Sequence, residues 1–212
     1  MRAIRLIVGL GNPGAQYEGT RHNAGAFFVR QLARDSALAL TSDRNASGEA
    51  ARGLVAGQDM RLLIPSTYMN ESGRSVAGMA NYYRIEPDEI LIAHDELDIA
   101  PGEARFKFDG GHGGHNGLRD IVPALGQRQD FWRLRIGIGH PGSANKVSPW
   151  VLNKPSQADR EAIEASIDEA IKALPLLLSG DPVKAMTALH SSNHSIPSPE
   201  SEPPVKTNPV KE

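Results

Sequence analysis

Apolar residues along the chain form short strand-like runs that alternate with longer stretches of helical spacing. Apolar runs that are nearly continuous, or that alternate with polar residues, are typical of buried strands. We expect such strands at residues 4–10, 52–56, 60–65, 89–94, 104–108 and 131–138. Apolar residues three or four positions apart predict helices at residues 24–37, 66–83, 118–125, 156–174 and 181–190, the second of them N-capped by Ser66.

This order of elements predicts the α/β fold class. Strands that alternate with helices favour a twisted, mostly parallel sheet surrounded by helices. The segment Gly57-Gln58-Asp59 separates two strands closely enough for a hairpin, which makes the sheet mixed. We therefore expect a single catalytic α/β domain over residues 1–190.

The last part of the chain has a different composition. Residues 191–212 are rich in Ser, Pro and Glu and carry few apolar side chains. A segment that cannot bury apolar surface does not offset the entropy lost on folding, so we predict a disordered tail over these residues.

The overall composition excludes several classes of protein. The chain has 212 residues and no cysteine, which rules out a disulfide framework and a thiolate nucleophile. Met1 is not followed by the apolar segment of a signal peptide, and no apolar run approaches the roughly 18–20 residues that cross a bilayer. We expect a cytoplasmic protein without a membrane partner.

Charge is unevenly distributed along the chain. The net charge is −2, but residues 105–154 contain eight Lys and Arg against three Asp and Glu. Such a stretch is either an ordinary solvated surface or a binding area for phosphates.

The first strand leads into a glycine-rich loop that matches a dinucleotide-binding pattern. Gly9, Gly11 and Gly14 fit G-x-G-x-x-G, which requires a helix directly after the loop. Here Asn12-Pro13-Gly14 favours a turn, and no apolar helical spacing begins before about Ala26. The sequence therefore argues against nucleotide binding.

Four loops concentrate polar residues, at 12–23, 65–73, 93–98 and 110–117, and three of them follow apolar strands. Ligands of open α/β sheets bind beyond the carboxyl ends of the strands, so we expect these loops to converge. A neutral histidine such as His22 accepts a proton from water near pH 7, and a carboxylate such as Asp95 orients it. Without a G-x-S-x-G motif or a cysteine, direct attack by water is favoured over a covalent nucleophile.

Two other interpretations remain open from the residues alone. His112 and His115, with His94-Asp95 elsewhere in the chain, are candidate ligands of a metal-dependent hydrolase. Their run of four glycines is more flexible than the usual support of a zinc site. The basic stretch also fits an RNA-binding module without catalysis, although the low aromatic content of 5% disfavours a stacking platform.

The chain resembles the bacterial peptidyl-tRNA hydrolase family over about residues 4–190. The blocks that carry the resemblance, in family order, are Gly9–Gly25, Thr67–Gly73, His94–Asp98, Gly110–Gly117 and Arg133–Pro141. The resemblance implies a monomeric, cofactor-free enzyme with no metal. It also implies hydrolysis of the ester between a peptide, or an N-blocked amino acid, and the 3′ ribose of tRNA.

The resemblance also implies the roles of the polar loop residues. His22 is then the general base, and Asp95 holds and polarises it. Asn12 lies by the acyl end of the substrate. Asn70 and Asn116 bind the peptide backbone and the attacking water.

The remaining roles implied by the resemblance concern tRNA, whose acceptor stem and 3′ end are the expected partner. Tyr17 and Tyr68 line the cleft near the 3′ end of the tRNA. Tyr68 stands where many members have Phe, which retains the ring and adds a hydroxyl. Arg105, Lys107 and Arg135 form part of a basic patch for the tRNA phosphates, in agreement with the positive stretch.

Overall fold

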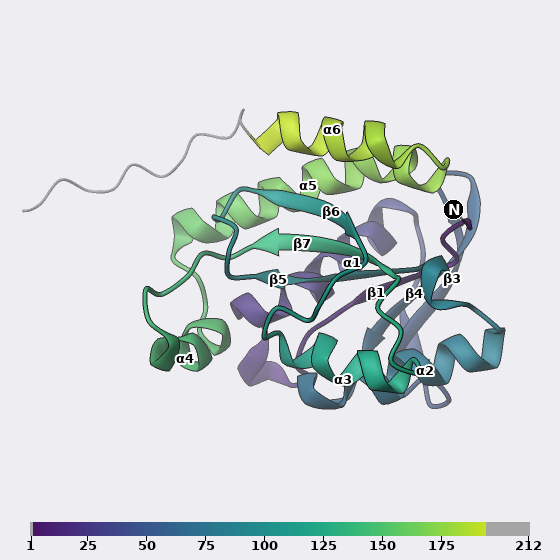
Figure 1. Cartoon of the computed structure of the whole chain (residues 1–212), viewed down its shortest axis with the longest axis horizontal. Coiled ribbons are helices and arrows are strands. Elements are labelled where there is room, and N and C mark those ends of the chain that lie inside the picture. Colours follow the sequence, from purple (N-terminus) through teal and green to yellow (C-terminus); the bar gives the residue numbers. More distant parts are fainter. Residues whose placement is uncertain (1, 194–212) are drawn as a thin grey trace, which may run out of the picture.

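Seven strands form one sheet at the centre of the protein (Figure 1). The structure is a computed structural model of the chain and describes residues 2–193. From edge to edge the strands are β2 (Thr41–Asp43), β3 (Gly48–Val55), β4 (Gln58–Pro65), β1 (Leu6–Gly9), β5 (Ile90–Glu96), β7 (Trp132–Gly137) and β6 (Ala104–Phe108).

The sheet is mixed, as the sequence predicts. The four central strands β4, β1, β5 and β7 are parallel, whereas β3 and β6 run antiparallel to their neighbours. The hairpin is confirmed, but its turn is Ala56-Gly57, both at positive φ, and Gln58 and Asp59 belong to β4. Strand β2 was not predicted, because its three residues are polar and lack apolar alternation.

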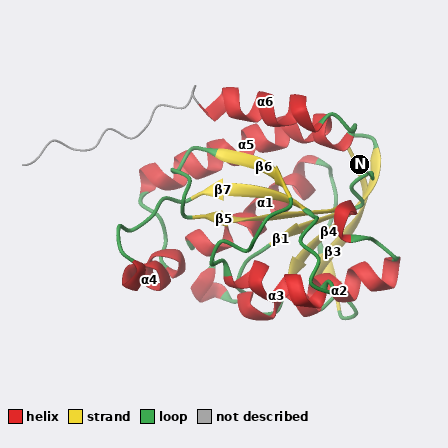
Figure 2. Ribbon diagram, viewed as in Figure 1, coloured by secondary structure: helices red, strands yellow, loops and turns green. Residues whose placement is uncertain are grey.

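Helices cover both faces of the sheet, giving three layers (Figure 2). On one face lie α1 (Ala24–Asp35), α5 (Gln157–Leu178) and α6 (Pro182–Asn193), and on the other lie α2 (Ser72–Tyr83) and α3 (Asn116–Ala124). Each of the two helical layers encloses an apolar core against the sheet, and Phe28 and Phe131 are among the largest fully buried side chains of these two cores. None of the helices within residues 2–193 is long and apolar enough to cross a membrane.

The structure differs from the sequence prediction at two helix boundaries and adds one short helix. Helix α2 begins at Ser72 rather than after Ser66, because a 3-10 turn at Met69–Glu71 precedes it. A short helix, α4 (Val147–Leu152), was missed. Helix α6 continues to Asn193, so the first three residues assigned to the tail are helical, and the remainder of that segment lies outside the described residues.

Two glycines allow α1 to approach the sheet closely. A Cβ on Gly25 would overlap the carbonyl oxygen of Ala93 in β5, and a Cβ on Gly9 would overlap that of Gly25. The start of α1 therefore lies directly against the carboxyl ends of β1 and β5. This close packing brings the loop before α1, which carries His22, next to Asp95.

Candidate active site

The polar loops predicted from the sequence meet at a cleft of about 680 Å³. Three of them follow β1, β4 and β5 at the carboxyl edge of the sheet. The fourth loop follows β6, which is antiparallel to β7, so its first residue lies near the amino ends of the central strands. This loop then crosses the face of the sheet to reach α3 at the cleft. All seven predicted residues of the catalytic and substrate-binding loops line this cleft: Asn12, Tyr17, His22, Tyr68, Asn70, Asp95 and Asn116.

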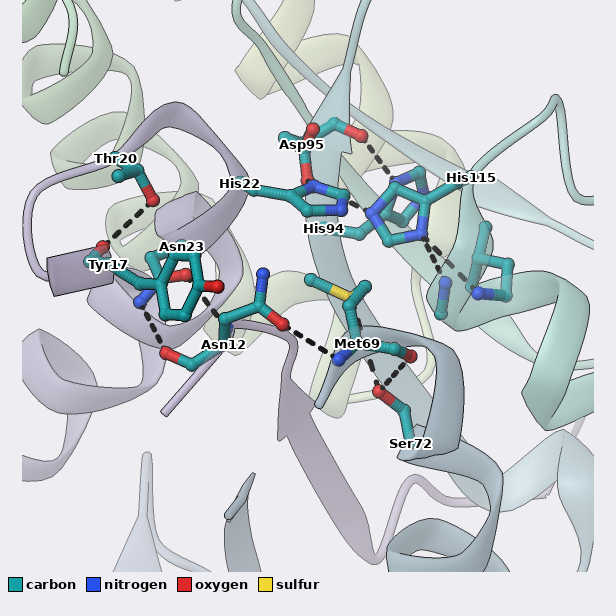
Figure 3. A network of polar contacts seen from close by, with 12 residues as sticks. Asn12, Tyr17, Thr20, His22, Asn23, Met69, Ser72, His94, Asp95 and His115 are labelled. Atoms are coloured by element: carbon teal, nitrogen blue, oxygen red, sulfur yellow. Dashed lines mark hydrogen bonds and ion pairs between the residues drawn. The ribbon is translucent and has the colours of Figure 1, made fainter. Parts of the chain in front are cut away.

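At the cleft floor, one carboxylate oxygen holds two histidines (Figure 3). Oδ1 of Asp95 lies 2.8 Å from Nδ1 of His22 and 2.9 Å from Nε2 of His115. Because Nδ1–H of His22 donates its hydrogen bond to Asp95, the other ring nitrogen, Nε2, carries a lone pair that is left to face the cleft.

The pair of His22 and Asp95 has the electrostatics of a base with its orienting acid. Burial alone raises the pKa of Asp95, but the charges and hydrogen bonds of the two histidines outweigh burial and hold it well below its usual range. Burial lowers the pKa of His22, whereas Asp95 raises it, and the net pKa lies above its ordinary value of 6.5. The carboxylate therefore stays ionised and makes His22 a stronger base.

The metal site considered for His112 and His115 does not fit this geometry. The backbone N–H groups of Gly117 and Leu118 donate to Nδ1 of His115, which caps α3 and leaves the ring proton on Nε2, facing Asp95. An ion on Nε2 would push that proton to Nδ1, against the two donors. His112 is exposed, and no group of three candidate metal ligands within residues 2–193 includes it.

Within residues 2–193, His22, Asp95 and His115 form one group of candidate metal ligands, whose ligand atoms lie within 4.8 Å of one another. The same objection applies to it, because it also requires Nε2 of His115. The donor chemistry of these residues thus favours a hydrogen-bonded base over metal ligation.

A third histidine holds the backbone of Asp95 without acting as a base. Nδ1 of His94 donates to the backbone oxygen of Asp95 at 2.7 Å, and its ring packs edge-on against His115 at 5.0 Å. Complete burial, reinforced by His115, lowers the pKa of His94 to about 3. His94 is therefore neutral and contributes to the shape of the site rather than to its charge.

Asn12 presents its amide nitrogen to the site. The backbone N–H of Met69 donates to Oδ1 of Asn12 at 2.8 Å, so the NH2 group points towards the space beside His22 (Figure 3). The side chain of Asn23 brackets the Asn12 backbone, accepting from its N–H at 2.8 Å and donating to its carbonyl at 3.0 Å. Asn12 is thus fixed as a donor in the cleft.

Other residues of the cleft form its rim. Oδ1 of Asn116 accepts from Arg119 at 3.1 Å, which again leaves an amide NH2 group available. The rings of Tyr17 and Tyr68 meet edge to face with centroids 6.5 Å apart, and Tyr68 is 53% exposed. An exposed ring such as that of Tyr68 is suited to stacking on a base.

The three predicted basic residues lie outside the cleft. Lys107 and Arg135 line a second hollow of about 260 Å³, and Arg105 is paired with Arg135 in register on β6 and β7. Arg135 forms an ion pair with Glu96 and Arg105 one with Glu103, each at 2.9 Å. Lys107 has no ion pair with any residue in the described part of the chain.

The site can be compared with known proteins. A model of the family described as peptidyl-tRNA hydrolase matches residues 6–197. The chain belongs to the peptidyl-tRNA hydrolase family. The resemblance stated from the sequence is thereby confirmed, and the mixed seven-stranded sheet confirms the predicted α/β fold class.

Several peptidyl-tRNA hydrolases are similar over almost their whole length. The protein of Pseudomonas putida is 58% identical over 191 residues, covering 90% of this chain and 98% of that protein. The protein of Chromohalobacter salexigens is 56% identical over 193 residues, covering 91% and 100%. A crystal structure of peptidyl-tRNA hydrolase from Acinetobacter baumannii has a TM-score of 0.85 and 52% identity, covering 88% of this chain and 94% of that one.

Some residues of this peptidyl-tRNA hydrolase site were missed from the sequence. His115 was considered only as a metal ligand, whereas its helix cap and its bond to Asp95 arise from the fold. Met69 contributes a backbone N–H, which no side-chain pattern reveals. An apolar wall of the cleft comes from α4, including Val147 and Val151.

Proposed function

We propose that this chain hydrolyses the ester that joins a peptide, or an N-blocked amino acid, to the 3′ ribose of tRNA, with His22 as the general base. The observation that carries the proposal is the buried bond between Asp95 and Nδ1 of His22 at the floor of the cleft. It rests also on membership of the family.

Each proton in the proposed reaction has a defined path. Nε2 of His22 accepts a proton from water while the water oxygen bonds to the ester carbonyl carbon. Asp95 stabilises the imidazolium that forms, and the amide groups of Asn12 and Asn116 donate to the developing oxyanion or to the substrate carbonyls. When the intermediate collapses, the bond to the ribose 3′ oxygen breaks and that oxygen takes the proton from Nε2.

The remaining parts of the surface suggest how the tRNA is held. We assign the half-buried ring of Tyr17 and the exposed ring of Tyr68 to the 3′ end, by stacking. Lys107, Arg105 and Arg135 share one face of β6 and β7 and suit the phosphates of the acceptor stem. We also propose, from the resemblance, a monomeric and cytoplasmic enzyme that uses no cofactor.

The experiment that tests the function is release of free tRNA from an N-acetyl-aminoacyl-tRNA in the presence of EDTA. We expect full hydrolysis, because the proposed base needs no metal. Hydrolysis that EDTA abolishes and zinc restores would contradict the mechanism. Binding of the N-acetyl-aminoacyl-tRNA without any hydrolysis would instead support the alternative of an RNA-binding module without catalysis.

Lys107→Ala should weaken the binding of peptidyl-tRNA and reduce its salt dependence. Removal of one phosphate contact lowers the slope of log affinity against log salt by about 1. The measurement is KM between 50 and 200 mM salt, roughly the range over which such contacts are screened. Lys172→Ala, an exposed substitution on α5, is the control. An unchanged slope for Lys107→Ala would remove this residue from the tRNA surface.

A further inference from the structure

One apolar wall of the cleft is formed by a short helix. Helix α4 contributes Val147, Val151 and Leu152 to the cleft but is only six residues long. It stands beyond the carboxyl ends of β5 and β7 (Figure 1), where Val151 joins the apolar core and Val147 and Trp150 pack against it. A helix of this length is not stable alone, so its position depends on contacts with other elements.

Arg21, the residue before His22, supplies many of those contacts. Its side chain is 5% exposed, and Nη1 donates to the carbonyl oxygens of Trp150, Asn153 and Lys154 at 3.5, 3.4 and 3.1 Å. The backbone N–H of Arg21 also donates to the Asn153 oxygen, at 3.2 Å. These oxygens lie at the C-terminal end of α4, where the last carbonyls have no partner within the helix and a positive charge is favourable.

The guanidinium group of Arg21 also fixes the orientation of α4. It lies 3.7 Å from the centroid of the Trp150 ring, a cation–π distance, while the ring nitrogen of Trp150 donates to Gly139 beyond β7 at 2.9 Å. Nη2 of Arg21 forms an ion pair with Asp159 at the start of α5, at 3.2 Å. The end of β7, α4 and the start of α5 therefore meet at one buried guanidinium.

Three consecutive side chains thus define three sides of the cleft. Arg21 holds the α4 wall, His22 is bonded to Asp95 on β5, and Asn23 brackets the loop of Asn12. All three residues are buried in one 3-10 turn, so the distances between the base, its orienting acid and the walls depend on this turn.

We propose that Arg21 is a positioning residue that fixes the α4 wall relative to His22 and so sets the width of the substrate cleft. This inference rests on the proposed function for its kinetic consequence, but not for its structural one. Arg21 does not touch the reacting atoms. It acts through α4, which supplies apolar surface for the bound substrate.

The geometry calls for arginine and not for any other cation. A guanidinium is planar, spreads its donors over several acceptors and stacks on a ring, whereas an ammonium is a compact point charge without a stacking face. Arg21→Lys therefore retains the charge opposite Asp159 but loses the stacking and most of the carbonyl bonds. Arg21→Lys disturbs the structure less than Arg21→Met, because the methionine would leave the carboxylate of Asp159 without its buried partner.

The test combines kinetics with hydrogen exchange of Arg21→Lys. We expect KM for N-acetyl-aminoacyl-tRNA to rise roughly tenfold, because a displaced wall loses binding contacts, while kcat stays within about twofold, because the bond between His22 and Asp95 is unaffected. We also expect the backbone amides of α4 to exchange at least about tenfold faster than in the wild type, since the helix loses its C-terminal anchor.

Two control variants separate positioning from general stability. Arg52→Lys makes the same change in an exposed pair with Asp59 on the β3–β4 hairpin and should alter neither readout. Asp159→Asn removes the ion pair but retains the carbonyl bonds of Arg21, so its melting temperature should fall without a rise in KM. An unchanged exchange rate in α4 of Arg21→Lys, or an equal rise of KM in Asp159→Asn, would overturn the proposal. The exchange readout needs no turnover, so failure of the proposed hydrolysis and failure of this inference are distinguishable.

Discussion

His22→Ala is expected to bind N-acetyl-aminoacyl-tRNA normally and to lose nearly all turnover. A positioned general base contributes ~10²–10⁴-fold to a rate, and no other histidine of the cleft replaces it. His115 carries its proton towards Asp95, and His94 is buried with a pKa of about 3. The measurements are single-turnover hydrolysis and the equilibrium affinity for the substrate.

The control for this variant is His140→Ala, which removes an exposed histidine that lies outside the cleft. It should hydrolyse the substrate at the wild-type rate. If His22→Ala retained more than about a tenth of the wild-type rate, the assignment of the base would be wrong, because the expected loss is at least ~10²-fold.

Asp95→Asn is expected to have the second-largest effect, a loss of ~10²–10⁴-fold in kcat with a small change in KM. An amide can donate to Nδ1 of His22, which stabilises the tautomer with its proton on Nε2 and removes the lone pair from the cleft. The carboxylate is also lost as the partner of the imidazolium. Asp59→Asn, in an exposed ion pair, is the matched control and should leave kcat unchanged.

The same variant should change the pH profile in a defined direction. The base acts only when deprotonated, so the activity of the wild type falls as the pH drops through the pKa of His22, which lies above 6.5. Asp95→Asn removes the negative charge and the hydrogen-bond acceptor that raise the pKa of His22, and it retains the burial that lowers this pKa. On acidification, the residual activity of Asp95→Asn should therefore begin to fall at a lower pH than the activity of the wild type. A limb that moved to higher pH would contradict the proposed pairing of His22 with Asp95.

The fold was largely predictable because its central strands are buried on both faces. Continuous apolar runs at residues 4–10 and 89–94 identify β1 and β5 without tertiary information. Edge strand β2 and helix α4 were missed for the converse reason. Each is short and partly exposed, and its structure depends on neighbours, β3 in one case and Arg21 with Trp150 in the other.

The sequence by itself determined the α/β class, the family and the set of polar residues that reaches the cleft, because strand periodicity and the order of motifs are local properties of the chain. Only the tertiary structure decided how these residues act. The tautomer of His115 follows from its cap on α3, the pKa of His22 from the balance between burial and Asp95, and the α4 wall from the buried Arg21. The cap of His115 is local, but its bond to Asp95 and the other two features depend on contacts between segments far apart in the sequence, and hydrogen bonding and desolvation are set by those contacts.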